Sequence, residues 1–166
     1  AQEVITTPYD LAVMAARIRS ALRIAKRQQQ LETSNIELAK LASTDPLTHV
    51  YNRRHFFSLA HAEFARAKRY GRKLALIMLD IDDFKRVNDE YGHAAGDLAL
   101  ASLAEICRSS VRESDIIGRL GGEEFAICCP ESDIQGANVI AERIRSACEN
   151  LTLTFAEHRF SMTTSL

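Results

Sequence analysis

The sequence has no tryptophan and only three prolines, and neither sign of charge is in excess. Lys and Arg number 21 and Asp and Glu 22, for a formal net charge of -1. The chain therefore lacks the positive field with which proteins hold nucleic-acid phosphates. No apolar run reaches the roughly 20 residues of a membrane helix, and the N-terminus has no signal-peptide pattern. We expect a cytoplasmic protein with no nucleic-acid partner and no membrane span.

The few cysteines do not form a metal-binding or disulfide pattern. Cys107, Cys128, Cys129 and Cys148 include no C-x-x-C pair, and no histidine stands at zinc-ligand spacing. We expect buried, reduced thiols. Hydrophobic residues make up 46% of the 166 residues and charged residues 26%, an ordinary globular composition that suits one domain with an appendage.

The N-terminal part is predicted to be mostly helical. Residues 1–20 have the pattern of a strand end, a Thr7-Pro8 turn and a helix. Residues 21–42 contain no Gly or Pro, and a heptad repeat predicts a coiled-coil linker over 21–43. A solvated connector helix fits as well, because polar residues occupy one seam position. The apolar repeat consists of Ile24, Leu31 and Leu38, and the polar seam residues are Gln28 and Asn35.

The main domain is predicted to span residues 44–166. "STDPLT" offers a cap and a first helical turn at Pro46, and a second helix is capped by Asn52 and closed by Gly71. The order of the segments after it, βαββαβ, predicts an α/β (α+β) ferredoxin-like fold preceded by a long helix. These segments are a strand at 73–82 buried on both faces, a charged loop, a helix at 96–111, strands at 114–120 and 124–130, a helix at 132–150 and a last strand at 158–166.

Two acidic clusters lie where this fold would bring them together. The first and third strands of a βαββαβ sheet are neighbours, so the turn before the third reaches the end of the first. Like charges this close repel unless a cation lies between them, and Mg²⁺ prefers oxygen ligands. Each cluster alone would be an ordinary solvated loop, but together they favour metal-assisted phosphoryl chemistry. The acids are Asp80, Asp82 and Asp83 after the strand, and Glu123 and Glu124 after the Gly121-Gly122 turn.

Four motifs in order, "DPLT", "NRRHFF", "LDIDDFKRVNDEYGHAAGD" and "RLGGEEF", resemble the diguanylate cyclase catalytic domain, called GGDEF. The resemblance covers residues 44–166. It implies a fold like that of nucleotidyl cyclases and polymerase palms, and the condensation of two GTP molecules into cyclic di-GMP and pyrophosphate with Mg²⁺ or Mn²⁺. "TTPYDLAVMAARIRSAL" resembles the last strand and helix of a response-regulator receiver domain, which implies two-component signalling.

The resemblance implies roles in catalysis for the matching positions. Asp80, the Ile81 carbonyl and Glu123 would hold the metal, with Glu124 close enough to help. Glu123 would also accept the proton of the attacking ribose 3′-hydroxyl. Lys85 would counter the charge that builds on the phosphate, and the alternative for it is an ordinary surface lysine.

The resemblance also implies a guanine pocket formed by Asn88, His93 and Asp97. An amide, an imidazole and a carboxylate can pair with the edge of the base. Without the resemblance, His93 would be a histidine at a helix start and Asp97 a first-turn acid favoured by the helix dipole.

A third implied site is inhibitory and binds the product. "RESD", Arg112 to Asp115, resembles the R-x-x-D of that site, and Arg143 matches an arginine that completes it in some relatives. An R-x-x-D also occurs by chance on protein surfaces. Since each domain presents one GTP, the reaction requires a homodimer, and the linker would regulate how closely two domains approach.

The sequence departs from the family in two places. His49 and Val50 stand where the family has Gly-Leu, and a histidine enters left-handed backbone space with more strain than glycine. The family continues into a further helix with a lysine and an arginine that grip the triphosphate, whereas this chain ends at Leu166. We expect a C-terminally incomplete domain. The competing hypothesis is a catalytically inactive module that binds GTP or cyclic di-GMP and acts through dimerisation.

Overall fold

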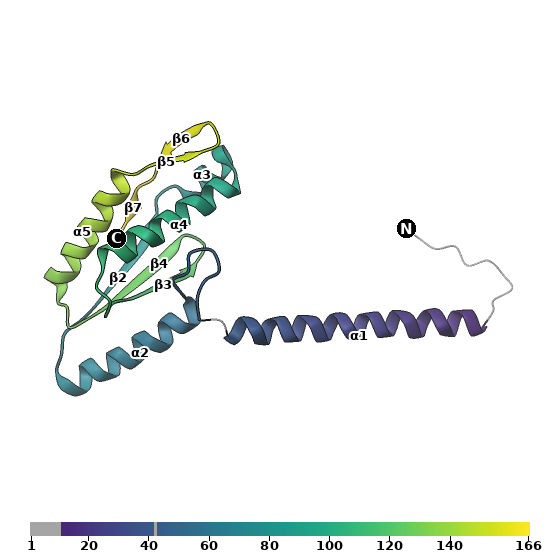
Figure 1. Cartoon of the computed structure of the whole chain (residues 1–166). Coiled ribbons are helices and arrows are strands. Elements are labelled where there is room, and N and C mark those ends of the chain that lie inside the picture. The colour runs from purple at the N-terminus through teal and green to yellow at the C-terminus, as the bar shows by residue number, and fades with distance from the viewer. Residues whose placement is uncertain (1–10, 42) are drawn as a thin grey trace. The chain divides into compact units, whose positions relative to one another are not determined.

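The computed structural model describes residues 11–41 and 43–166 (Figure 1). The chain separates into two compact units between Ala42 and Ser43. The strand and turn predicted before residue 11 lie outside the described residues.

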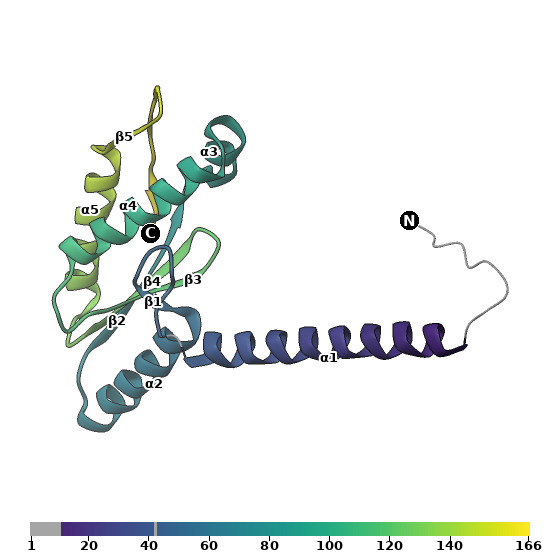
Figure 2. The same cartoon turned by 45° about the vertical axis from the view of Figure 1, so that its right-hand side comes forward.

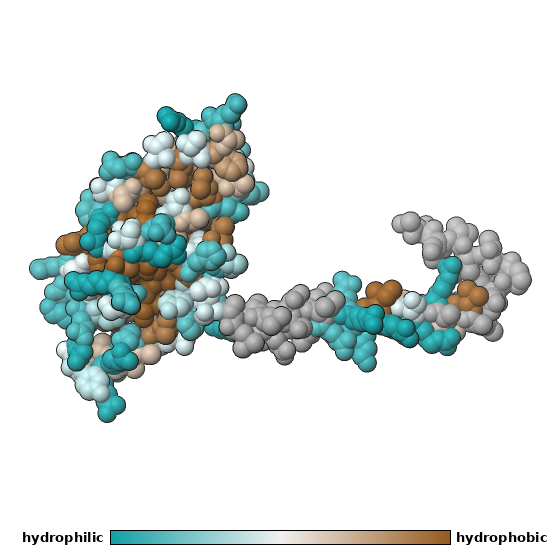
Figure 3. Space-filling view, in the orientation of Figure 1, coloured by the Kyte–Doolittle hydropathy of each residue, from teal (hydrophilic) through white to brown (hydrophobic). Residues whose placement is uncertain are grey.

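The first unit contains one long helix, α1 (Leu11–Leu41), of 31 residues. Side chains of Val13, Ile18, Leu22 and Ile24 are exposed on it, and brown apolar patches lie among hydrophilic side chains along α1 in Figure 3. Within residues 11–41 and 43–166, no helix combines the length and apolarity needed to cross a membrane. The coiled coil stays a prediction.

The second unit is built on a sheet with the strand order β1-β3-β4-β2-β7. The first and third strands of the βαββαβ core, β2 and β4, pair antiparallel from Leu74–Pro130 to Leu79–Phe125. This pairing confirms the predicted ferredoxin-like arrangement. The sheet strands are β1 (Tyr51–Asn52), β2 (Leu74–Ile81), β3 (Ile116–Gly121), β4 (Glu124–Pro130) and β7 (Thr164–Ser165).

Helices cover both faces of this sheet. In Figures 1 and 2, α4 and α5 lie side by side on one face and α2 lies on the other. As predicted, Asn52 caps α2 by accepting from His55 N–H, and Gly71 closes it in the left-handed conformation. The helices are α2 (Arg53–Tyr70), α3 (Phe84–Tyr91), α4 (His93–Ser110) and α5 (Ile134–Glu149).

Strand β2 is buried on one face only, so the prediction of burial on both faces is wrong for this strand. Leu79 is buried in the core against α4 and α5, whereas Leu76 and Met78 are 56% and 48% exposed. The cause is the placement of α2, which packs over β3 and not over the whole of β2. Gly118 of β3 allows this approach, because a Cβ there would stand 2.5 Å from Cβ of Phe56.

No helix begins at Pro46, contrary to the prediction; residues 46–48 form a turn. The Asp45 carboxylate accepts hydrogen bonds from the Thr48 N–H at 2.9 Å and hydroxyl at 2.7 Å. Asp45 therefore acts as a capping residue, but it caps a turn and not a helix. His49 has a φ of 57°, so it adopts the left-handed backbone conformation that the sequence analysis considered for this position.

The predicted charged loop after β2 is the helix α3. Phe84 and Val87, at helical spacing, pack into the core on one side of α3 while its charged residues face solvent. The predicted last strand is also wrong in part. Only Thr164–Ser165 joins the sheet, while β6 (His158–Ser161) forms a separate hairpin with β5 (Thr152–Phe155).

All four cysteines are free and buried, as predicted. Burial raises the pKa of Cys107 and Cys129 to about 12 and that of Cys148 to about 11. Burial also raises the pKa of Cys128. These thiols are protonated at neutral pH and are poor nucleophiles.

Candidate catalytic and regulatory sites

The predicted acidic ligands begin at the end of β2. The Asp80 side chain is exposed and makes no hydrogen bond or ion pair with the described residues. Asp82 lies in the turn after β2, and its carboxylate accepts hydrogen bonds from the hydroxyls of Thr163 at 2.7 Å and Ser165 at 2.5 Å. The bonds from Ser165 and then Thr163 lower the pKa of Asp82. Asp82 is therefore held by β7 and its flank, whereas Asp80 is free to bind a ligand.

The turn between β3 and β4 brings the second acidic cluster to Asp80. Gly122 has a φ of 44°, a conformation that glycine adopts without a Cβ clash. Burial, followed by the negative charges of Glu123, Glu124 and Asp82, raises the pKa of Asp80. Two clusters that are far apart in sequence thus interact electrostatically, as the sheet topology predicted.

The chemistry of these side chains fits a divalent cation. Pairing of β2 with β4 ends at Leu79–Phe125, and Ile81 pairs with Thr164 on the other side. Within the described ranges, 11–41 and 43–166, no three Asp, Glu, His or Cys side chains are already grouped as a metal site. The acids beside Asp80, whose charges after burial are the further causes of its raised pKa, nevertheless repel one another. A hard cation with carboxylate ligands would relieve this repulsion.

The predicted substrate residues lie on the two helices that follow. Lys85 of α3 is exposed and has no ion pair among the residues described. Asn88 of α3 packs beside α4, on which His93 and Asp97 are exposed one turn apart. The structure therefore gathers the polar groups of the proposed guanine pocket at the α3–α4 corner.

Sequence reasoning missed two residues near these sites. Gly96 of α4 leaves room for Asn88, because a Cβ at Gly96 would stand 2.1 Å from Oδ1 of Asn88. Arg119 of β3 donates hydrogen bonds to the Gly122 carbonyl in the acidic turn. A glycine inside a helical pattern is a sequence signal for close approach, but the direction of the Arg119 side chain has no such signal.

The predicted product-binding residues lie near the end of α4. The Asp115 carboxylate accepts a hydrogen bond from the Arg112 N–H at 2.9 Å. The Arg143 guanidinium, from α5, donates to the Ser110 carbonyl. The Arg112 guanidinium itself makes no hydrogen bond or ion pair with the described residues, so it is available to a ligand.

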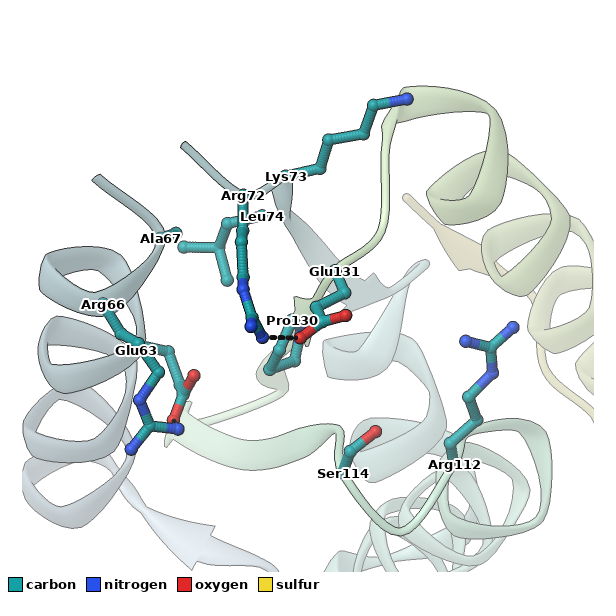
Figure 4. Close-up of a pocket in the computed structure, with 10 residues that line it drawn as sticks. All are labelled: Glu63, Arg66, Ala67, Arg72, Lys73, Leu74, Arg112, Ser114, Pro130 and Glu131. Atoms are coloured by element: carbon teal, nitrogen blue, oxygen red, sulfur yellow. Dashed lines mark hydrogen bonds and ion pairs between the residues drawn. The ribbon is translucent and has the colours of Figure 1, made fainter. Parts of the chain in front are cut away.

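A cavity of about 440 Å³ adjoins Arg112, and its lining contains none of Asp80, Glu123 and Glu124. In Figure 4, Arg112 lies across the cavity from Glu63 and Arg66 of α2, and Arg72 is bonded to Glu131 between them. Arginine and lysine side chains outnumber acids in the lining. Arg66, Arg72 and Lys73 are already paired with acids, so among the described residues Arg112 is the lining cation available to an anionic ligand. Sequence reasoning predicted only Arg112 among the lining residues.

Comparison with protein families matches residues 42–166 to the model described as "Diguanylate cyclase, GGDEF domain". The chain is 42% identical over 124 residues to a diguanylate cyclase of Vibrio cholerae, covering 75% of this chain and 36% of the relative. It is 32% identical over 157 residues to the response regulator PleD of Caulobacter vibrioides, covering 95% and 35% respectively. The chain thus spans about a third of the length of these curated relatives.

A solved structure resembles this chain along most of its length. The coiled coil and GGDEF domain of DgcB from Caulobacter crescentus, in complex with c-di-GMP, superposes with a TM-score of 0.72 and 26% identity. The match covers 93% of this chain and 80% of the other. The mixed α/β fold is therefore that of solved GGDEF structures.

Proposed function

The chain belongs to the diguanylate cyclase family that is defined by the GGDEF domain, and from this premise we propose that it condenses two GTP molecules into cyclic di-GMP with release of pyrophosphate. The observation that carries the proposal is the convergence of Asp80 with Glu123 and Glu124 through the pairing of β2 with β4; burial and then the charges of these acids raise the pKa of Asp80. Concentrated acids of this kind suit phosphoryl transfer assisted by divalent ions.

Four groups are proposed to hold Mg²⁺ or Mn²⁺: Asp80, the Ile81 carbonyl, Glu123 and Glu124. When bound, the cation supplies positive charge that offsets the phosphates and acidifies the attacking hydroxyl. Glu123 accepts the proton of the ribose 3′-hydroxyl. Lys85, which is exposed and unpaired among the described residues, would balance the charge that builds on the phosphate in the transition state.

Guanine is proposed to bind at the α3–α4 corner. The Asn88 amide, the His93 imidazole and the Asp97 carboxylate offer both donors and acceptors to the base edge. The packing of Asn88 against Gly96 supports this assignment, because a short side chain fixed by a close contact recognises its partner with less entropy loss than a mobile one.

The product is proposed to inhibit the enzyme by binding at Arg112, Asp115 and Arg143. The free Arg112 guanidinium and the adjoining cavity support this proposal. Arginine offers a fork of donors that suits phosphate and guanine edges. The c-di-GMP in the DgcB structure shows that a protein of this fold binds the product.

The proposed organisation is a segment at 1–20 that resembles the end of a receiver domain, a coiled-coil linker at 21–43 and the cyclase domain at 44–166. Exposed apolar side chains on α1, such as Ile18 and Ile24, support pairing with a second copy. The match to the response regulator PleD over 95% of this chain supports a two-component context. We place the homodimer in the cytoplasm, where GTP is available.

Incubation of the purified protein with GTP and Mg²⁺, followed by mass spectrometry, tests the proposal. Cyclic di-GMP is expected, and its formation is expected to rise more than linearly with protein concentration because two domains must meet. Binding of cyclic di-GMP or GTP without turnover would replace the proposal by its alternative, an inactive binding module that acts through dimerisation.

A further inference from the structure

Arg119 bonds to the acidic turn with two of its side-chain groups. Its Nε and Nη2 donate hydrogen bonds to the Gly122 carbonyl at 2.9 and 2.8 Å. The peptide group that contains this carbonyl joins Gly122 to Glu123. Because the peptide group is planar, fixing its oxygen also fixes the direction in which the chain enters Glu123.

The same guanidinium reaches the loop that begins the domain. Its Nη1 donates to Oδ1 of Asp45 at 3.2 Å, and the side chains of Arg119 and Asp45 are only 17% and 19% exposed. Burial alone would raise the pKa of Asp45, but hydrogen bonds from Thr48 and Arg119 outweigh it and keep the pKa below its usual value. The pair is therefore charged at neutral pH.

The loop of residues 43–50, called here the leading loop, is itself tied to the sheet by its backbone. Asn52 N–H donates to the Ser43 carbonyl at 3.0 Å, and Asp45 N–H donates to the Val50 carbonyl at 2.8 Å. Asp45 follows the last residue of α1, Leu41, by four positions. Arg119 thus links the segment directly after the helix to the turn that carries Glu123.

We infer that Arg119 is a positioning residue, which holds Glu123 in its productive direction and connects that direction to the leading loop. The inference rests on the proposed function and adds to it a residue that touches neither metal nor substrate. Arginine is required because its planar fork presents donors to Gly122 and Asp45 at once, which the single ammonium of lysine cannot do in the same geometry.

A matched pair of variants separates positioning from general stability. Arg119→Ala removes the links to both Gly122 and Asp45. Arg108→Ala is the control, because Arg108 also bonds the leading loop, at the Thr48 carbonyl at 2.9 Å, but does not contact the turn. Initial rates over a range of GTP concentrations give kcat and KM for both, and thermal melting confirms folding.

We expect Arg119→Ala to lower kcat about tenfold or more, because small displacements of a catalytic group have large effects on rate. The KM for GTP should change less than about twofold, and Arg119→Lys should restore part of kcat because it keeps one donor. Arg108→Ala should keep kcat near that of the unmodified protein. An equal loss of kcat in Arg119→Ala and Arg108→Ala would overturn the inference.

A readout that needs no turnover keeps this test separate from the proposed function. The NMR order parameter of the Glu123 backbone amide should be lower in Arg119→Ala than in Arg108→Ala, since the turn loses its anchor at the Gly122 carbonyl. If the unmodified protein makes no cyclic di-GMP, the proposed function fails but this comparison still decides the positioning role. Equal order parameters in the two variants would refute it.

Discussion

The two ends of the paired strands β2 and β4 place aspartate side chains in opposite environments. At the end beside the β3–β4 turn, Asp80 of β2 has no cation partner among the described residues, and burial followed by the neighbouring acids raises its pKa. At the far end, Lys73 pairs with Asp133 at 2.8 Å, and this bond, followed by the Gly136 N–H, lowers the pKa of Asp133. The contrast teaches that the partners of an acid, and not its identity, distinguish a ligand site from a structural pair.

The largest expected effect is at the turn end. Glu123→Gln should reduce formation of cyclic di-GMP by about 10²- to 10⁴-fold, because the amide cannot accept the hydroxyl proton. The rate is measured by mass spectrometry with GTP and Mg²⁺. The control is Glu142→Gln, which removes a surface acid already paired with Arg145. If Glu123→Gln kept the turnover of that control, the base assignment would be wrong.

A smaller effect is expected at the guanine corner beside the turn end. Gly96→Ala places a Cβ 2.1 Å from Oδ1 of Asn88, so the amide must move. We expect the KM for GTP to rise on the order of tenfold through loss of its hydrogen bonds to guanine. In Gly136→Ala, where the nearest atom is 3.6 Å from the Cβ, KM should not change. Equal KM values in both variants would remove Asn88 from the pocket.

At the opposite end, Arg112→Ala should weaken the binding of cyclic di-GMP by about tenfold, the loss expected when a charge-assisted hydrogen bond is removed. Isothermal titration calorimetry measures the affinity directly. Arg145→Ala removes an exposed arginine that is paired with Glu142 and Glu149 and serves as the control. Unchanged affinity in Arg112→Ala would show that the product binds elsewhere.

The smallest expected effects are on thermal stability, and they test the contrast between Asp80 and Asp133 directly. The pKa of Asp80 is raised in the folded state, so its ionisation opposes folding once the pH exceeds the unfolded value. Asp80→Asn should therefore raise the melting temperature at pH 7 by about 1–3 °C, and the gain should disappear at a pH below the pKa of the unfolded carboxyl. Mg²⁺ should raise the melting temperature of the unmodified protein more than that of the variant.

Asp133→Asn should change the melting temperature at pH 7 in the opposite direction from Asp80→Asn. The pKa of Asp133 is lowered by Lys73, so its contribution to stability is present above the unfolded pKa and is lost as the pH falls through the folded one. The variant should melt at a lower temperature at pH 7 and like the unmodified protein in acid. Shifts of equal sign in Asp80→Asn and Asp133→Asn would contradict the contrast.

Much of the fold could be predicted because it depends on patterns along the chain. The apolar run of β2 and the glycine turn before β4 predicted their pairing, which the register Leu79–Phe125 confirms. The helix α3 was missed because its few apolar residues, Phe84 and Val87, are separated by charged ones. The exposed face of β2 could not be predicted, because the sequence does not reveal how far α2 extends across the sheet.

The candidate site also has one part that the sequence predicts and one part that it does not. Topology alone predicted that Asp80 and Glu123 approach each other, and the charge effect on Asp80 agrees. The contacts of Asn88 with Gly96, and of Arg119 with Gly122, depend on where side chains point after the helices and strands have packed. Spacing along a sequence does not determine those directions.

The burial of all four cysteines makes the protein convenient for site-specific labelling. With pKa values of about 11 or 12 for three of the thiols, native cysteines should react slowly with maleimides at neutral pH. A new thiol on the exposed surface of α1, for example Ser20→Cys, would therefore carry a spin label almost alone. Distances between labels on two copies would then test whether the α1 helices pair as proposed, without removal of any native cysteine.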